Sequence, residues 1–218
     1  MSAIPGAVQR RTVLIIATLA AFLTPFMSSA VNIALPSIAS EFALDAISLS
    51  FVASSYLLAA AMFLVPFGRF ADIHGRKRVF TLGIIVFTTS ALLSALAPSG
   101  LALIFFRFIE GTGSAMIYGT GIAMITSVFP SDERGQALGI NVTAIYIGLA
   151  LGPFIGGYLT EFLTWRSIFL TNIPLGIYVI YQIHRHLNEE WADARGERFD
   201  IHGSVFYSAT LLAIMYGF

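Results

Sequence analysis

The chain has 218 residues, of which 57% are hydrophobic and only 11% are charged, and its mean hydropathy is +0.82. Soluble domains carry about 25% charged residues, so this composition excludes a soluble globular protein and indicates an integral membrane protein. The chain contains no cysteine, which excludes disulfides, thiolate metal sites and cysteine nucleophiles, and its formal net charge of zero gives no indication of a nucleic-acid partner.

Apolar stretches alternate with short polar segments along the whole chain. A membrane-spanning helix needs about 20 mostly apolar residues, and seven stretches approach or exceed that length: 13–35, 49–67, 79–96, 101–129, 136–162, 168–183 and 201–218. Pro36, Pro98 and Pro130 follow the first, third and fourth stretches, and we expect each to end a helix. We therefore predict an all-α polytopic membrane protein. A six-helix bundle occupies residues 1–187, a cytoplasmic linker 188–200, and a seventh span 201–218, within which the sequence ends.

The first apolar stretch has one alternative interpretation, a cleaved secretory signal. Arg10 and Arg11 precede it, and the sequence SSA at residues 28–30 looks like a cleavage site. The stretch is too long for a signal, and further spans follow it instead of a polar mature domain. We therefore expect a membrane helix here.

Polar and aromatic residues also recur along this first stretch, at Thr18, Phe22, Pro25, Ser29 and Asn32. Intervals of three or four residues place them on one face of a helix. We expect that face to form part of a cavity wall. An ordinary packed face, with its hydroxyls bonded to their own backbone, is the alternative.

Lys and Arg are distributed unequally between the two sides of the predicted membrane. One side has Arg166 alone, and Arg107 lies inside a span. The other side has the rest: Arg10, Arg11, Arg69, Arg76, Lys77, Arg78, Arg134, Arg185, Arg195 and Arg198. Because cytoplasmic loops carry the excess of positive charge, we predict a cytoplasmic N-terminus and a multi-pass protein of the inner (plasma) membrane.

The loop between the second and third spans, residues 68–78, reads GRFADIHGRKR. A basic loop that only fixes the topology is the simplest interpretation, but it does not account for an acid between two glycines. Gly68 lets two helices touch, Gly75 permits a tight turn, and Asp72 can accept hydrogen bonds at a helix N-terminus. We therefore expect a functional element at the cytoplasmic surface.

The fourth span contains LIFFRFIEGTGSAM, residues 103–116, with two charges at membrane depth. A central Arg costs about 2.5–3.5 kcal/mol to insert, so Arg107 is expected to face the bundle interior or an aqueous cavity. Helical spacing extends one polar stripe through Arg107, Glu110, Ser114, Tyr118 and Gly121. The alternatives are that Arg107 reaches the outer headgroups or only pairs with Glu110 one turn away.

The fifth span contains GLALGPFIGGYL, residues 148–159. Gly148, Gly152 and Gly156 recur every four residues and leave a flat ridge on which another helix can pack closely. Pro153 removes a backbone donor in mid-helix and favours a bend. A plain packing helix is the alternative to a functional role.

These motifs together resemble the major facilitator superfamily. The loop resembles its signature G-x-L-A-D-R-x-G-R-K-x, which Gly68, Ala71, Asp72, Gly75, Arg76 and Lys77 match and Phe70 and Ile73 do not. The fourth span resembles R-x-x-Q-G-x-G, with Glu110 in place of Gln, and the fifth resembles the antiporter pattern G-x-x-x-G-P-x-x-G-G without mismatch.

The first span narrows the resemblance to the drug:proton antiporter branch with fourteen spans. Residues 26–36, FMSSAVNIALP, resemble its pattern L-D-x-T-I-V-N-V-A-L-P, with Met27 where the pattern has Asp. The stretches 164–176 and 199–218 agree with the same branch. The resemblance thus covers nearly the whole chain. It implies an N-terminal transporter bundle made of two inverted three-helix repeats.

The resemblance implies proton-driven efflux of amphipathic small molecules by alternating access. Because Met27 replaces the acid of the first helix, Glu110 becomes the candidate proton carrier beside Arg107. Burial favours a neutral carboxyl and Arg107 a charged one, so opening and closing can switch the site. The implied sets are the substrate cavity (Phe22, Ser29, Asn32, Ser114, Tyr118, Tyr146), the cytoplasmic gate loop (Gly68, Asp72, Gly75, Arg76, Lys77) and the antiporter helix (Gly148, Gly152, Pro153, Gly156, Gly157).

Other chemistries find little support. His184 and His186 form the sole metal-like pair, no third ligand is placed beside them, and neither a catalytic set nor an ATP-binding P-loop is present. We expect no enzyme activity, metal or cofactor. Residues 189–200 are expected to be a solvated mixed-charge linker.

The length is about half that of a fourteen-span transporter. We therefore expect a fragment of a longer exporter, with membrane lipid, protons, a small-molecule substrate and a C-terminal half as its partners. One alternative is that the chain pairs with a separately encoded half or with a second copy of itself. Two others are a metabolite symporter and a truncated protein without transport activity.

Overall fold

The computed structural model describes residues 7–187 and 190–217. Over these residues the secondary structure is entirely helical: α1 (Ala7–Phe42), α2 (Ala46–His74), α3 (Arg76–Ala95), α4 (Gly100–Val128), α5 (Ser131–Phe162), α6 (Arg166–His186) and α7 (Ile201–Tyr216). The predicted all-α fold is therefore confirmed. Residues 188 and 189 of the predicted linker and Phe218 of the predicted seventh span lie outside the described residues.

Side-chain caps fix where several helices begin. The carboxylate of Asp45 accepts a hydrogen bond from Ser48 N at 2.8 Å and starts α2, and Asp200 does the same for α7 with Gly203 N at 2.8 Å. A side-chain oxygen at this position satisfies a backbone donor that has no partner within the helix. Gly75 separates α2 from α3 with a φ of 119°, a conformation that favours glycine.

The prediction that Pro36 ends the first helix is wrong, because α1 continues through Pro25 and Pro36 to Phe42. Proline removes one backbone bond in a helix interior, here the bond to the carbonyl of Asn32. Asn32 and Pro36 are both exposed, so this carbonyl is not enclosed by protein. Pro98 and Pro130 do lie between helices as expected.

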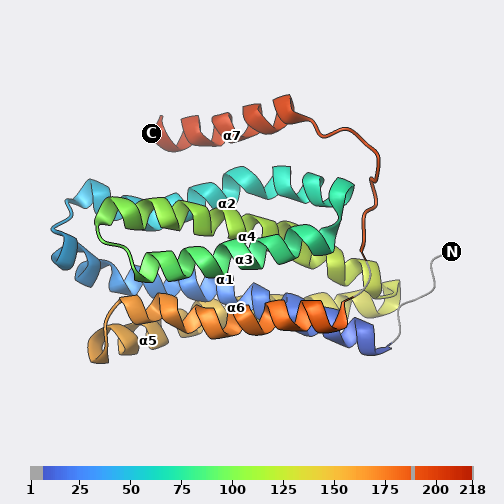
Figure 1. Cartoon of the computed structure of the whole chain (residues 1–218), viewed down its shortest axis with the longest axis horizontal. Helices are drawn as coiled ribbons and strands as arrows, with labels where there is room; N and C mark the ends of the chain where they lie inside the picture. The colour runs from blue at the N-terminus through green and yellow to red at the C-terminus, as the bar shows by residue number, and fades with distance from the viewer. Residues whose placement is uncertain (1–6, 188–189, 218) are drawn as a thin grey trace.

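The helices lie side by side as an elongated bundle (Figure 1). α1 packs along α5, α2 along α4, and α3 between α4 and α6. Helices α1 to α5 are long and apolar enough to cross a membrane by length and composition, whereas α6 is less apolar and α7 has only 16 residues. One end of the bundle carries the start of α1, the α2–α3 and α4–α5 turns and the segment after α6; we call it the linker end (Figure 1).

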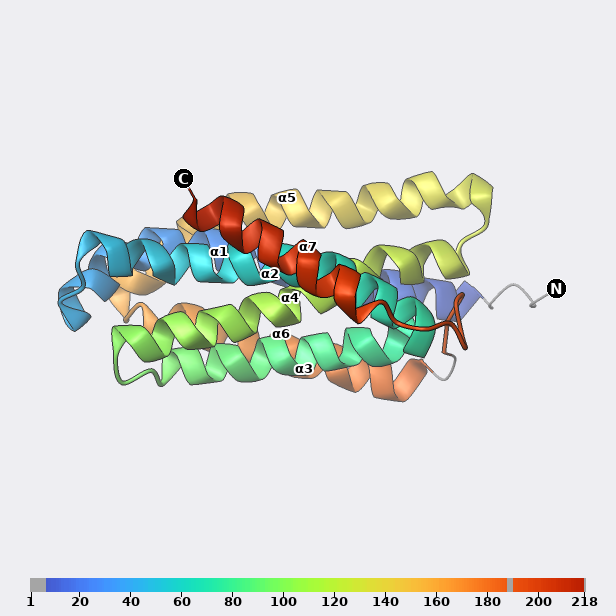
Figure 2. The same ribbon diagram turned by 90° about the horizontal axis from the view of Figure 1, so that it is seen from above.

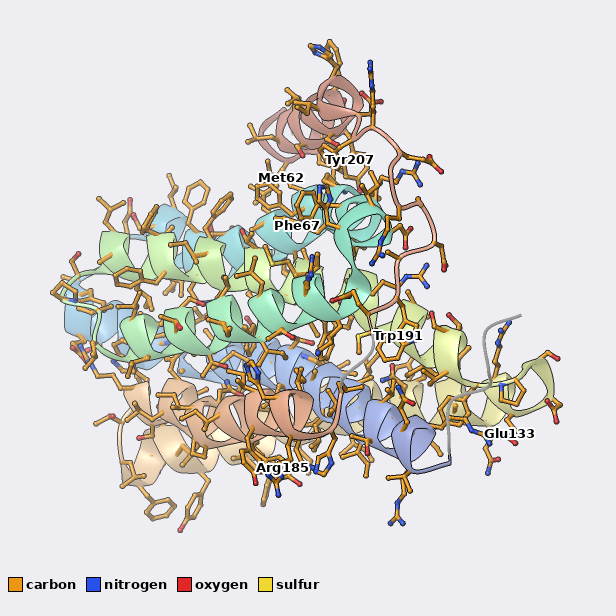
Figure 3. All side chains as sticks on the ribbon, turned by 45° about the vertical axis from the view of Figure 1, so that its right-hand side comes forward. Met62, Phe67, Glu133, Arg185, Trp191 and Tyr207 are labelled. Carbon is orange, nitrogen blue, oxygen red and sulfur yellow. The ribbon has the colours of Figure 1, made fainter. Side chains whose placement is uncertain are left out.

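α7 lies outside the six-helix bundle and packs mainly against α2 (Figures 1 and 2). Tyr207 donates a hydrogen bond to Ala61 O at 3.3 Å, and Ser208 donates one to Met62 O at 3.0 Å. Figure 3 shows Tyr207 directed at the part of α2 that carries Met62 and Phe67. These bonds attach the seventh helix to the surface of the bundle.

Candidate functional site

A buried ion pair lies in the N-terminal half of α4. Arg107 Nη1 is 3.0 Å from Glu110 Oε2, one helical turn away, and the two side chains are 1% and 0% exposed. Removing two charges from water costs several kcal/mol per ion unless they find compensating partners. Arg107 therefore faces the bundle interior and does not reach the headgroups.

Three helices enclose the guanidinium of Arg107. Its Nε donates to Val52 O of α2 at 3.3 Å. The ring of Tyr56, one turn further along α2, lies 4.3 Å from the guanidinium carbon, and the ring of Phe169 on α6 lies 6.0 Å from it. A cation over an aromatic face is attracted by the ring quadrupole, most strongly when water is excluded. Packing and charge thus hold Arg107 in one position.

Tyr56 connects this ion pair to α1 and to a second position on α4. Its hydroxyl lies 3.2 Å from Thr24 O of α1 and 2.9 Å from Ser114 Oγ of α4. A carbonyl oxygen can only accept, so the phenol proton goes to Thr24 O and the Ser114 hydroxyl donates to the phenol oxygen. The sequence analysis missed Tyr56; its signal was a side chain with a polar tip inside an apolar span.

The two carboxylate oxygens of Glu110 differ in their hydrogen bonding. Oε2 accepts from Arg107, whereas Oε1 is buried without a hydrogen-bond partner among the described residues. The same holds for both side-chain polar atoms of Asn172 on α6 and for the hydroxyl of Thr88 on α3. Buried polar groups in proteins are almost always satisfied, so Glu110 Oε1 is an exception among the described residues.

The six residues predicted to line a substrate cavity differ in how far they are buried. Ser29 and Ser114 are buried; Ser29 donates to Phe26 O of its own helix at 3.3 Å, which is the alternative considered for this face. Asn32 is exposed, Tyr146 is 65% exposed, and Phe22 and Tyr118 are half-buried. Phe22 stacks on Phe26 with ring centres 5.4 Å apart.

Two cavities border the bundle. One, of about 440 Å³, lies between α1 and α5 and is lined by Thr18 together with Gln136, Thr143 and Ile147. The other, of about 530 Å³, lies between α2 and α7, where Phe63, Phe67, Phe70 and Phe199 face Ser204 and Ser208. Both volumes fall in the range of small-molecule sites, about 300–1,000 Å³.

The gate loop forms a compact charged cluster at the linker end. Both Nε and Nη2 of Arg76 donate to Asp72 Oδ1, at 2.9 and 2.7 Å, and Nη1 donates to Ser127 Oγ of α4 at 2.8 Å. Asp72 thus binds an arginine side chain instead of a helix N-terminus. Gly68 meets Gly119 of α4, where an added Cβ would lie 3.3 Å from the Gly68 main chain, so the two helices touch as the motif suggests.

The segment after α6 docks onto this loop, so the expectation of a solvated linker is wrong for residues 190–192 and Ala194, which are partly or fully buried, whereas Asp193 and residues 195–197 are exposed. Arg76 N donates to Trp191 O at 2.8 Å, and Ala194 N donates to Asp72 O at 2.9 Å. Figure 3 shows Trp191 lying against the linker end of the bundle. These main-chain bonds fix the path of the segment across the α2–α3 turn.

Acidic side chains of the docked segment bind the basic residues of the loop. Glu190 Oε1 accepts Lys77 N at 2.9 Å and Arg78 N at 3.4 Å, which caps the start of α3. Asp193 lies 2.6 Å from Arg76, and Glu197 pairs with Arg69. Opposite charges at matching positions thus explain why a polar segment is not simply solvated.

The glycines of the antiporter pattern pack against α1. A Cβ on Gly148 would lie 2.5 Å from Phe22 O, and a Cβ on Gly156 would lie 2.9 Å from Ala30. At Gly152 the added atom would lie 1.8 Å from Ser29 Oγ. The ridge therefore allows close helix contact, as its spacing predicts. Pro153 is exposed on another face of α5, and Gly157 borders the contact.

Comparison with known proteins identifies relatives over nearly the whole chain. The chain is 31% identical over 207 residues to the riboflavin transporter RibZ of Clostridioides difficile (strain 630), covering 95% of this chain and 45% of that protein. It is 38% identical over 211 residues to the cephamycin export protein CmcT of Amycolatopsis lactamdurans, covering 94% and 43%. The multidrug resistance protein Stp of Mycobacterium tuberculosis (strain CDC 1551 / Oshkosh) is 35% identical over 187 residues, covering 85% and 35%. The chain thus spans less than half the length of these relatives.

A solved structure has the same fold. It is a bacterial homologue of the human lysosomal transporter Spinster in an inward-facing, unoccupied conformation, which matches with a TM-score of 0.71 at 20% identity, over 88% of this chain and 47% of that one. The profile of the Major Facilitator Superfamily matches residues 17–216. The relatives named for export and multidrug resistance agree with the antiporter-type motifs. The chain is a multi-pass membrane protein that belongs to the major facilitator superfamily.

Proposed function

We propose that this chain forms the N-terminal half of a proton-coupled transporter that exports amphipathic small molecules by alternating access. The observation that carries the proposal is the buried Arg107–Glu110 pair, enclosed by α2, α4 and α6, with one Glu110 oxygen unpartnered among the described residues. Ionisable groups inside a membrane bundle are costly, and they commonly mark ion or proton pathways.

Protonation of Glu110 would change the force balance on Arg107. With Glu110 charged, the guanidinium has its counter-charge 3.0 Å away. A proton on Oε1 removes that counter-charge and leaves a buried cation, which favours any conformation that supplies another partner or admits water. A conformational equilibrium shifts only by the difference in interaction energy between its states, and this pair supplies such a difference.

The gate loop is proposed to hold the linker end closed in one of the two states. Asp72, Arg76 and the docked segment bind one another in this conformation. A second half, from the same longer chain or from a separate subunit, would meet this surface when the transporter closes. Lys77 and the glycines Gly68 and Gly75 set the shape of the surface, and the ridge of α5 lets α1 and α5 move as closely packed neighbours.

The proposed orientation places the linker end in the cytoplasm and the protein in the inner (plasma) membrane. The α2–α3 turn, the α4–α5 turn and the segment after α6 all lie at this end (Figure 1), and most Lys and Arg residues of the chain belong to these segments or to the residues next to them. At the opposite end Arg166 pairs with Glu41 at 2.6 Å. Because positive loops remain in the cytoplasm during insertion, this asymmetry supports a cytoplasmic N-terminus.

Amphipathic small molecules are the proposed substrates. The cavities beside α1 and α2 have apolar walls with few hydroxyl or amide groups, which suits such molecules. Two of the relatives are named for cephamycin export and for multidrug resistance, and the glycine–proline pattern of α5 favours export over uptake.

Everted membrane vesicles test the proposal. The chain is co-expressed with a second half taken from a relative, the vesicle lumen is made acidic so that protons can leave as dye enters, and dye accumulation and proton movement are recorded together. Dye uptake should collapse the gradient in the parent protein and in Asp132→Asn, an exposed acid in the first turn of α5, but not in Glu110→Gln. Gradient-driven uptake that survives Glu110→Gln would refute the coupling site, and dye movement with the protons would indicate a symporter.

A further inference from the structure

We infer that a cavity between the first turn of α3 and the last turn of α6 binds the headgroup of an anionic phospholipid, whose acyl chain lies along the outer face of α3. This site is separate from the ion pair and from the gate contacts of Asp72. It rests on the proposed orientation only in that the cytoplasmic leaflet is the anionic one.

The cavity has a basic rim and an apolar floor. Its volume is about 460 Å³. Lys77 and Arg78 border it from α3 and His184 from α6, and its apolar lining consists of Leu82, Ile85 and Ile183. Lys and Arg provide positive charge, and the His184 ring adds a hydrogen-bond donor or acceptor. Basic cavities between membrane helices at the cytoplasmic side are suited to anionic headgroups.

Glu190 contributes an acid to the same cavity, but its charge is already engaged. One oxygen accepts the backbone N–H groups of Lys77 and Arg78, and the other lies 3.5 Å from Arg78 Nε. That distance is a loose pair, and the Arg78 side chain is 77% exposed. The guanidinium can therefore turn toward a phosphate without breaking the cap on α3.

The position of the cavity relative to the membrane favours a lipid. α3 is 20 residues long and apolar enough to span, so Lys77 and Arg78 in its first turn lie at a membrane surface. From there exposed apolar side chains continue along α3 toward the opposite end of the bundle: Leu82, Ile85, Leu92 and Leu93. Positions three and four residues apart form one helix face.

The basic rim and the apolar face of α3 together favour a phospholipid over a free phosphate. A soluble phosphate uses the basic rim alone, whereas a lipid also covers the apolar face that starts at Leu82. The continuity of rim and face in one groove is the observation that commits the site to a lipid. A second copy of the chain on this face would use the apolar side chains but has no need of the basic rim.

Native mass spectrometry of the whole chain in detergent tests the site, with phosphatidylglycerol or phosphatidylcholine as the added lipid. The test variant is Arg78→Gln/His184→Gln. The matched control is Arg185→Gln/His186→Gln, which also replaces one Arg and one His. These two residues directly follow His184 on α6, are exposed and do not line the cavity. Figure 3 shows Arg185 on the outer side of the bundle.

We expect phosphatidylglycerol to bind more tightly than phosphatidylcholine. The test variant should weaken phosphatidylglycerol binding roughly fivefold for the lost positive charge, and the control should leave it unchanged. Arg78→Lys keeps the charge and should restore binding. Leu82→Gln should weaken phosphatidylglycerol binding without changing the weak binding of glycerol 3-phosphate.

Several outcomes would overturn the inference. Equal binding of the two lipids removes the charge preference, and equal losses in test and control variants reduce it to the general charge of this end. Full competition by glycerol 3-phosphate identifies a phosphate site without a lipid. Dimers that form through Leu82 and exclude lipid identify a second copy as the occupant. Because binding is measured without transport, none of these results depends on the proposed export function.

Discussion

The guanidinium of Arg107 on α4 lies 4.3 Å from the centre of the Tyr56 ring on α2, and the hydroxyl at the far end of that ring lies 3.2 Å from Thr24 O of α1. One aromatic side chain therefore joins the buried charge to the backbone of another helix. If α1 and α2 separate, Tyr56 loses its hydrogen bond to Thr24 O, and the position of its ring against the Arg107 guanidinium changes as well. This geometry links helix movement to the environment of the ion pair.

Tyr56 substitutions should separate the ring from the hydroxyl. Tyr56→Phe keeps the ring beneath Arg107 and removes the hydroxyl, so we expect it to lower the free energy of unfolding by about 0.6 kcal/mol, as measured for hydrogen bonds inside membrane bundles. Tyr56→Leu also removes the cation–π contact and should cost about 2 kcal/mol more. Unfolding of the purified variants in detergent measures both, and equal losses would show that the ring contributes nothing.

The intact ion pair should add little to the free energy of unfolding, although removal of only one of its charges should be strongly destabilising. Glu110→Gln leaves Arg107 buried without a counter-charge and should destabilise the protein by about 3–5 kcal/mol. Arg107→Met/Glu110→Met removes both charges and should recover most of that loss, because apolar replacements of buried pairs are often neutral. A double variant as unstable as Glu110→Gln would contradict this. Proton-coupled dye uptake should be absent from both.

The sequence was sufficient to predict features that arise from local periodicity. Apolar length located each of the described helices, because a membrane-spanning segment must be both helical and apolar. The bounds agree within five residues except at both ends of α1 and the end of α2, where the helix continues six or seven residues further. The four-residue spacing of Gly148, Gly152 and Gly156 predicted a close helix contact, and the spacing of Arg107, Glu110 and Ser114 predicted one buried polar face. Each of these features depends on residues within one helix.

Features that depend on contacts between distant segments could not be predicted. Glu190 binds the backbone of Lys77 across 113 positions, and Tyr56 meets Ser114 across 58. Charge composition alone assigns the segment 190–197 to solvent, and nothing local to it identifies the basic loop as its partner. The set of cavity residues stays a prediction, and the structure adds one contact that the sequence could not give: α5 covers the polar face of α1 at Ser29.

The contact between α5 and α1 should not tolerate a methyl group. Gly152→Ala would place a Cβ 1.8 Å from Ser29 Oγ and 2.8 Å from Phe26 O. Relief requires the helices to move apart, so we expect a loss of about 1–3 kcal/mol in the free energy of unfolding. Gly139→Ala on the same helix is the control, since nothing lies within 4 Å of its added Cβ; alanine should be neutral or slightly stabilising there. Similar losses at both positions would show that helix packing is not the cause.

Asp45 at the start of α2 should give the protein a stability that depends on pH in acid. The hydrogen bond from Ser48 holds the pKa of Asp45 below its ordinary value. A group whose pKa is lowered on folding stabilises the protein above its unfolded pKa, and that contribution disappears as the pH falls through the folded value. Asp45→Asn keeps a cap without a charge, so its unfolding temperature should change less between neutral pH and pH of about 3. Identical profiles for the parent and Asp45→Asn would exclude this role.

The docked segment should open when its acidic anchors are removed, and Glu190 should matter more than Asp193. Asp193 is 72% exposed, and exposed ion pairs contribute about 0–1 kcal/mol. Glu190 is 19% exposed and accepts two backbone N–H groups, and hydrogen bonds to charged groups contribute about 1.5–3 kcal/mol.

Trypsin cleavage after Arg195 and Arg198 reports this opening, because cleavage follows the population of the open segment when reclosing is fast. We expect Glu190→Ala to raise the rate at least about tenfold and Asp193→Ala to raise it about fivefold at most. Cleavage after Arg11, an exposed residue at the start of α1, provides the internal reference, and Asp132→Ala provides the charge control. If all three variants were cleaved at the parental rate, the contacts of residues 190–197 would have no energetic role, and the loop would be held by Asp72 and Arg76 alone.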